Sequence, residues 1–83
     1  MRYIFVRLEI RVVEREFFSD CLHPVSSPVS KEEFADECAR TFYGGSHDPA
    51  DGGYYFDGGE VHVSVHRVDE VTEADAAVLS RYI

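Results

Sequence analysis

The sequence predicts a single α+β domain over residues 1–83, in which a three- to four-stranded antiparallel sheet carries two helices packed mainly on one face. Three observations lead to this prediction. Residues 3–13 alternate between two kinds of side chain, two helical stretches follow capping residues, and the turn Asp57-Gly58-Gly59 separates two strand-like runs. The expected order of elements is β(β)αββα.

The first strand is expected over residues 3–13. Its even-numbered side chains from Ile4 to Val12 are all aliphatic, whereas the odd-numbered ones include charges and two aromatics. A period of two with many β-branched residues is typical of a strand with one buried face. Residues 16–25 give a weaker signal for a second strand, reached through a turn near residues 13–16. Pro24 and Pro28 predict a loop after it.

A helix is expected to begin after Ser30, because Ser30 and Glu33 form a capping box. Apolar residues then recur at helical spacing as far as Phe42, and Gly44-Gly45 supplies the left-handed position that ends many helices. The other side of this helix carries acids near its N-terminus, where the helix dipole favours negative charge. These acids are Glu32, Glu33, Asp36 and Glu37.

The run YYF-DGG-EVHVSV predicts a β-hairpin whose second arm has valines on one side and His62 and His66 on the other. The acidic, glycine-containing residues before it are expected to form a flexible connector. Thr72 and Asp75 cap a second helix that closes the chain.

Charge is the most unusual feature of the composition, with sixteen acids, eight bases and a net charge of −8. Residues 1–31 hold five bases and four acids, whereas residues 32–83 hold three bases and twelve acids, a balance of −9. Direct nucleic-acid binding is disfavoured because phosphate contacts need a basic surface. A partner protein with a basic surface would instead be attracted. Solubility or adaptation to salt would explain the same bias.

The acids fall into groups that a small domain can bring together on one anionic surface. The predicted partner-binding residues are Glu32, Glu33, Asp36, Glu37, Asp48, Asp51, Asp57, Asp69, Glu70 and Glu73. Such a surface can occupy a groove meant for nucleic acid through the same electrostatics that attract phosphate. Each group taken alone is equally explained by solvated acids at a capped helix N-terminus or in a loop.

A second contact surface is expected on the sheet face opposite the aliphatic core, if the helices leave that face open. The residues placed there are Tyr3, Phe5, His62 and His66. Aromatic side chains outside a core indicate a dimer or partner contact. The segment Phe17-Phe18 is an alternative cover for them.

The spacing of the histidines does not predict a metal site. On a strand, His62 and His66 lie about 13 Å apart at roughly 3.3 Å per residue, which is too far to share one ion with bonds near 2 Å. Folding could still bring Cys21 and His23 together with a further ligand in a structural zinc site. Cys21 and Cys38 are expected to be free, partly buried thiols, and a disulfide between them is the alternative.

Cofactor and catalytic signatures are missing from the sequence. The acids between residues 48 and 57 lack the spacing of a calcium-binding EF-hand loop, and the paired glycines match neither phosphate-binding glycine pattern. No local motif marks a nucleophile. We therefore expect no metal, no cofactor and no enzymatic activity. No apolar run approaches the roughly 18–20 residues of a transmembrane helix, so we expect a cytoplasmic protein without a membrane partner.

In its small size, acid excess, α+β layout, GGYYFDGGEV hairpin and capped C-terminal helix, the whole chain resembles short acidic proteins of phages and mobile elements. Anti-CRISPR proteins are the functional group that it resembles most. Those inhibitors share no common motif, so no binding residue is carried over. The resemblance implies a monomer or homodimer that binds a CRISPR effector stoichiometrically in a bacterial or archaeal host and blocks nucleic-acid binding or nuclease recruitment. The alternative is a structural module that dimerises through its exposed sheet face.

Overall fold

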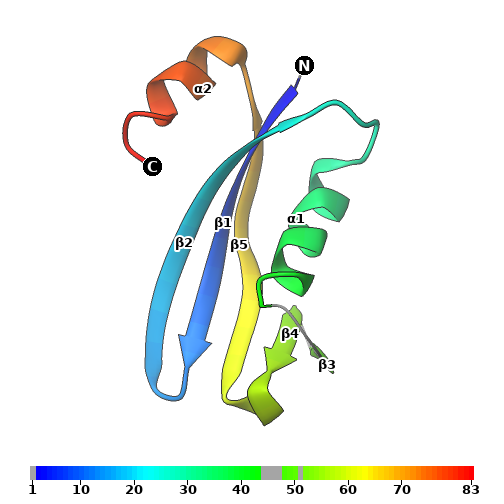
Figure 1. Cartoon of the computed structure of the whole chain (residues 1–83), viewed down its shortest axis with the longest axis vertical. Helices are drawn as coiled ribbons and strands as arrows, with labels where there is room; N and C mark the ends of the chain where they lie inside the picture. Colours follow the sequence, from blue (N-terminus) through cyan, green and yellow to red (C-terminus); the bar gives the residue numbers. More distant parts are fainter. Residues whose placement is uncertain (1, 44–47, 51) are drawn as a thin grey trace.

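The computed structural model describes residues 2–43, 48–50 and 52–83, whose elements follow the order ββαβββα. Within these residues, five strands form one antiparallel sheet in the spatial order β2-β1-β5-β4-β3 (Figure 1). The strands are β1 (Arg2–Val12), β2 (Arg15–Val25), β3 (Asp48–Ala50), β4 (Gly53–Phe56) and β5 (Val61–Val71). The helices are α1 (Lys31–Arg40), α2 (Glu73–Leu79) and the short 3-10 turn η1 (Asp57–Gly59).

The α+β class and the antiparallel sheet are confirmed, but the predicted number of three to four strands is wrong for the residues described. The weak signal at residues 16–25 corresponds to a full strand, β2, which pairs with β1 along its whole length. The strand beyond the predicted four is β3, which pairs with β4 where the sequence predicts a flexible connector. Three residues that include a proline are too short to show an alternating pattern, so this strand leaves no sequence signal.

The hydrophobic core lies on one face of the sheet and is covered by α1. The predicted alternation of β1 is confirmed, since its even-numbered residues from Ile4 to Ile10 are buried. Ile4, Val6 and Val63 have no exposed surface. Burying one such branched side chain stabilises the fold by about 1.5–3 kcal/mol. Ala35 and Ala39 are the buried residues of α1, and their small side chains allow the helix to lie close to the strands.

Both helices begin where the capping residues predict. The Ser30 hydroxyl accepts a hydrogen bond from the backbone N–H of Glu33 at 3.1 Å, and the Thr72 hydroxyl accepts one from the N–H of Asp75 at 3.1 Å. The end of the first helix differs from the prediction, because α1 stops at Arg40. The glycine pair at residues 44–45 lies outside the described part of the chain.

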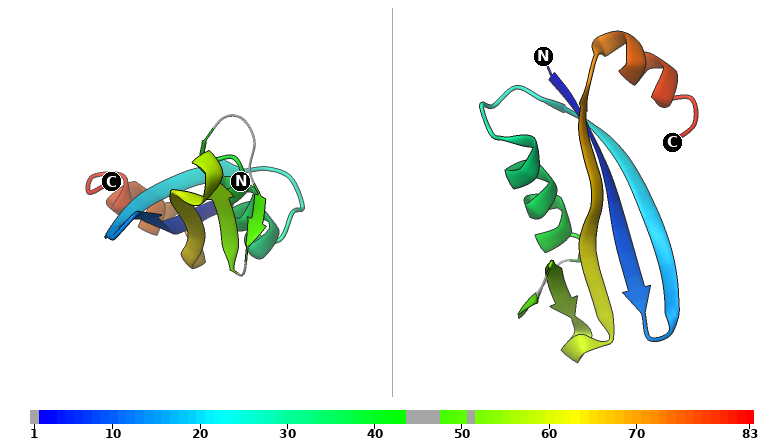
Figure 2. Two further views of the ribbon diagram at one scale, coloured as in Figure 1. Left: turned by 90° about the horizontal axis from the view of Figure 1, so that it is seen from below. Right: turned by 180° about the vertical axis from the view of Figure 1, so that it is seen from behind.

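The two helices lie on opposite faces of the sheet, which corrects the prediction that both pack mainly on one face. Leu79 of α2 lines a hollow with Phe5 and Asp69, and the strand register places these two residues on the face away from the core. Figures 1 and 2 show α1 and α2 on opposite sides of the long strands. The physical reason is that β1 begins with two aromatic side chains, Tyr3 and Phe5, on its outer face, and the short α2 lies beside Phe5.

Two turns meet at the far end of the sheet, where β1 runs into β2 and β4 runs into β5. Val13 in the first turn has a left-handed φ of 57°, which is costly for a β-branched residue. Its N–H donates a hydrogen bond to the carbonyl oxygen of Glu60 in the second turn at 3.2 Å. Asp57, Gly58 and Gly59 all have positive φ values, so the predicted hairpin turn is confirmed and its glycines serve turn geometry.

Candidate partner-binding surface

Four of the predicted acids gather on the outer side of α1, and we call them the α1 surface. They are Glu32, Glu33, Asp36 and Glu37. Helical spacing places Glu32 one turn from Asp36 and Glu33 one turn from Glu37, with the Cβ atoms of each such pair about 5–6 Å apart. The core-facing residues Ala35 and Ala39 fix which side of the helix is turned outward. The α1 surface is therefore a direct product of the amphipathic pattern of the helix.

Two open hollows flank α1, and Glu32 and Asp36 line both of them. The first hollow also contains Val29 and Phe34 at its apolar side. The second lies between α1 and the β3–β4 hairpin. It is lined by Glu32, Ala35, Asp36, Pro49, Gly52, Gly53, Tyr54, Val65 and Val68. Each hollow thus combines an apolar wall with carboxylates, an arrangement that suits the aliphatic stem and charged head of a lysine or arginine.

Tyr54 holds one of these carboxylates in place. Its hydroxyl lies 2.8 Å from each carboxylate oxygen of Asp36 and donates a hydrogen bond to them. This bond raises the pKa of Tyr54, with desolvation and the negative charge of Asp36 contributing further. Because the phenol is neutral, the contact fixes the position of Asp36 between α1 and β4 without neutralising its charge.

The charge of the α1 surface is only partly balanced by cations. Arg40 forms an ion pair with Glu37 three residues earlier on the same helix. Among the residues that the structure describes, Glu32, Glu33 and Asp36 form no ion pair with a lysine, arginine or histidine. These three carboxylates therefore remain available for a positively charged partner.

The remaining predicted acids are distributed over other parts of the molecule. Asp48 pairs with Tyr55 in the β3–β4 register, which places it on the sheet face away from α1. Asp57 belongs to the exposed turn η1. Asp69 forms an ion pair with Arg67 at 2.5 Å. The structure does not bring these three acids onto the α1 surface.

Two further predicted acids lie at the end of β5 and the start of α2. Glu70 is 3.9 Å from Arg2, whose guanidinium also donates to the backbone carbonyl of Val29. Glu73 is exposed in the first turn of α2. Asp51 lies outside the described residues. The described residues therefore do not form the single merged surface expected from the sequence. Of the nine predicted acids that the structure describes, the four on α1 lie together and the other five lie elsewhere.

The sheet face away from α1 carries a second set of charges, which we call the open sheet face. Besides Tyr3, Phe5 and His62, its members include Arg7, Glu9, Arg11, Glu16, Phe18, Asp20 and His66. Most of these charges pair with each other. Arg7 donates two hydrogen bonds to Asp20, at 2.7 and 3.0 Å, and this contact lowers the pKa of the Asp20 carboxyl. Arg11 bonds to Glu9 at 3.2 Å and to Glu16 at 2.9 Å.

The residues predicted for a dimer contact divide into two groups. Tyr3 and Phe5 are partly buried at the end of the sheet near α2. His62 and His66 lie further along the same face. The ring of His62 is 4.9 Å from Tyr55, and His66 meets the edge of Phe18 at 5.0 Å. Phe18 therefore packs against His66. Tyr3 and Phe5 of β1 lie instead at the end of the sheet where α2 is located.

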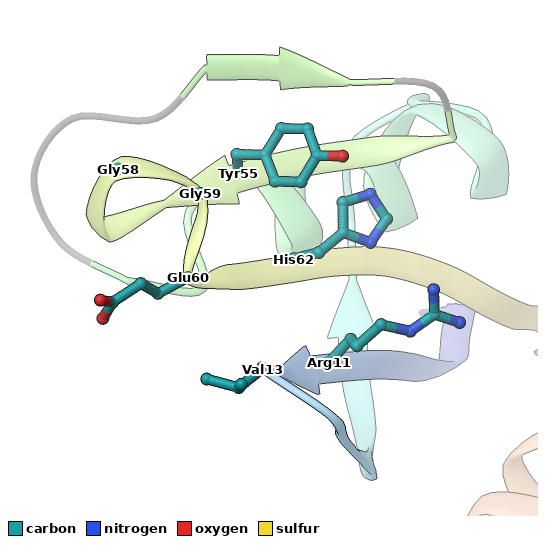
Figure 3. A pocket seen from close by; sticks show the side chains of 7 residues that line it. All are labelled: Arg11, Val13, Tyr55, Gly58, Gly59, Glu60 and His62. Carbon is teal, nitrogen blue, oxygen red and sulfur yellow. The ribbon is translucent and has the colours of Figure 1, made fainter.

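A further hollow lies beside the two turns, and Figure 3 shows its lining residues. Arg11, His62 and Tyr55 come from three adjacent strands and lie on the same side of the sheet, while Val13 and Glu60 lie at the turns. A cationic pocket here would suit an anion. However, the guanidinium of Arg11 already donates to two carboxylates, so the hollow lacks an available positive charge.

Metal ligation by histidine and cysteine side chains depends on where the described residues place them. No group of three or more histidine, cysteine, aspartate or glutamate side chains among them is placed to hold a metal ion. His23 packs against Phe34, with ring centroids 5.3 Å apart. Cys21 and Cys38 are free thiols, and burial raises the pKa of Cys38, to which the neighbouring Cys21 contributes.

Sequence reasoning identified the acids of α1 but missed Tyr54 and the apolar walls of the second hollow. Tyr54 and Asp36 are eighteen residues apart in the chain, and no periodic pattern connects a residue on a strand with one on a helix. A partial signal existed in the hairpin prediction, which placed Tyr54 on a strand.

Within the residues that the structure describes, none of the helices has the length and apolar character needed to cross a membrane. Comparison of the chain with protein families, with curated proteins and with solved structures found no match.

Proposed function

We propose that this chain is a non-enzymatic inhibitor that binds a basic protein partner through the α1 surface. The observation that carries the proposal is that Glu32, Glu33 and Asp36 project from one helix and form no ion pair among the described residues. Asp36 is additionally held by Tyr54. Preorganised charge of this kind steers an oppositely charged partner and selects it over neutral surfaces.

The partner class that best fits is a protein with a basic groove for nucleic acid. A row of carboxylates on a helix presents negative charges to such a groove in place of phosphates, and the hollows on either side accept lysine or arginine stems. Together with the resemblance to anti-CRISPR proteins, this favours a CRISPR effector subunit in the cytoplasm of a bacterial or archaeal host. Occupation of the groove would block binding of the target nucleic acid.

The alternative, a module that dimerises through the open sheet face, has less support from the geometry. The charges of that face pair across neighbouring strands, and Phe5 lies beside α2. A flat dimer contact there would have to bury ion pairs, which costs desolvation energy.

The proposal is tested by titrating the protein into purified CRISPR effector complexes and measuring target-DNA binding and cleavage. We expect loss of DNA binding at a stoichiometric ratio with at least one effector type. The inhibitory complex should weaken as salt increases, because exposed charges are screened within about 8–10 Å at 0.1–0.15 M salt. Unimpaired DNA binding and cleavage across the effector types would contradict the proposal.

A further inference from the structure

The outer edge of β2 is the longest open strand edge of the described residues. β2 has eleven residues, and its only strand neighbour in the sheet is β1. Figure 1 shows β2 at one margin of the sheet, with the short β3 at the other. The β3 edge is three residues long and contains Pro49, both of which protect an edge from pairing. The β2 edge is long enough to accept another strand.

The strand register identifies which backbone groups of β2 point outward. The N–H of Val13 bonds to Glu60 on the β5 side, so odd-numbered residues of β1 direct their backbone groups towards β5. Even-numbered residues of β1 therefore bond to β2, and they pair with odd-numbered residues of β2. The outward N–H and C=O groups of β2 consequently belong to its even-numbered residues. Pro24 is one of these, and its missing N–H does not disturb the pairing with β1.

Electrostatics permit two β2 edges to approach one another. Residues 2–25, which form the β1–β2 hairpin, contain four arginines and four acids and are neutral overall. The rest of the chain holds four bases and twelve acids and thus carries the whole net charge of −8. Phe17 and Phe18 are 49% and 52% exposed on the two sides of this edge, so pairing would also bury apolar surface.

We propose that two copies of this chain pair through their β2 edges, antiparallel, with Ser19 on the two-fold axis. In this register Phe18 faces Asp20 of the second copy, and Glu16 faces Leu22. Shifting the second copy by two residues in one direction sets Glu16 against Asp20, and in the other direction sets Asp20 against itself. Like charges directly opposite one another destabilise a strand pair. A shift by four residues in one direction sets Pro24 against Phe18, where a hydrogen bond would be lost, and in the other direction shortens the ladder to residues 15–19 of each copy.

The result is one continuous sheet across both copies, with Phe17 of each beside Cys21 of the other. This pairing occupies the open edge of β2 in both copies. The two α1 surfaces lie at the outer ends of the dimer. This inference concerns a different edge of the molecule from the proposed function and does not depend on it.

Sedimentation equilibrium of the wild-type chain and two variants at Phe18 tests the pairing. Phe18→Pro removes an outward N–H, whereas Phe18→Ala removes the side chain and retains the N–H. We expect a dimer for the wild type, at least ten-fold weaker dimerisation for Phe18→Pro than for Phe18→Ala, and native circular dichroism for both. A wild type that stays monomeric at millimolar concentration would overturn the proposal, and so would a dimer that Phe5→Glu separates and Phe18→Pro leaves intact.

Cross-linking tests the register in a chain that also carries Cys21→Ser and Cys38→Ser. Paired Ser19 residues would have Cα atoms about 4.5 Å apart, within the roughly 4.4–6.8 Å that a disulfide spans. Ser19→Cys should therefore form a covalent dimer with diamide as the oxidant. Arg15→Cys is the control, because its two copies would lie about 27 Å apart at 3.4 Å per residue. Equal cross-linking of both variants, or of neither, would overturn this register.

Discussion

The β1–β2 hairpin and the α1 surface both carry acidic side chains, but only the hairpin supplies most of them with cations. In the hairpin, Arg7 binds Asp20, and Arg11 binds both Glu9 and Glu16. On α1, one of four acids pairs with Arg40. The two surfaces thus differ in how many of their acids form ion pairs with arginine, more than in the number of acids. Acids without such ion pairs can attract a basic partner, whereas the charge of paired acids is already balanced.

The cause of this difference is local geometry. Antiparallel register places Arg7 directly opposite Asp20 and Arg11 directly opposite Glu16, so the two strands exchange opposite charges. Helical spacing instead places Glu32 near Asp36, where both charges are negative. The N-terminal dipole and the cap of Ser30 allow α1 to tolerate this acidity. The same residue types thus give a balanced surface on the sheet and an unbalanced one on the helix.

The largest stability effect is expected from the cap that supports the α1 surface. Ser30→Ala removes the hydrogen bond to the N–H of Glu33 and should lower the free energy of unfolding by about 1 kcal/mol. Urea denaturation at pH 7 measures this loss. Ser26→Ala is a matched control at an exposed serine, and it should change the free energy of unfolding very little. Equal losses in the two variants would show that α1 does not depend on its cap.

A smaller and pH-dependent effect is expected for the paired hairpin. The hydrogen bonds from Arg7 lower the pKa of Asp20, so the pair stabilises the fold when pH exceeds the unfolded-state pKa of about 3.9. This stabilisation is lost as pH falls through the lower folded-state pKa. Asp20→Asn should therefore destabilise the protein at pH 7, and the difference from the wild type should shrink in acid. Urea midpoints measured from pH 7 downward provide the test. A difference that does not depend on pH would show that the ion pair contributes nothing.

The smallest effect is a change in titration that reports the charge on α1. The carboxylate of Asp36 raises the pKa of Tyr54, because it accepts a hydrogen bond from the phenol and repels the phenolate. Asp36→Asn should lower the pKa of Tyr54 towards its ordinary value while the fold stays intact. Tyrosinate absorbance against pH measures this shift, and Tyr54→Phe identifies the contribution of this tyrosine. An unchanged titration in Asp36→Asn would contradict the placement of Asp36.

Sequence patterns predicted the parts of the fold that depend on neighbours along the chain. The alternation of β1, the caps at Ser30 and Thr72, and the turn at Asp57 follow from local physics. The position of α2 on the second face depends on tertiary packing beside Phe5. The α1 acids were predictable from helical spacing, whereas the bond between Tyr54 and Asp36 required the three-dimensional arrangement of α1 and β4.

Matched charge reversal on the two surfaces tests the central claim most directly. Glu33→Lys with Asp36→Lys alters the α1 surface, and Glu9→Lys with Glu16→Lys alters the hairpin. Each double variant adds four units of charge to the net −8 of the chain, so the two have equal net charge. The quantity to measure is the protein concentration that half-inhibits target-DNA binding by a susceptible CRISPR effector. We expect this concentration to rise at least ten-fold for the α1 variant and less than two-fold for the hairpin variant. Equal increases would show that overall charge, and not the α1 surface, determines binding, and a larger increase for the hairpin variant would contradict the account.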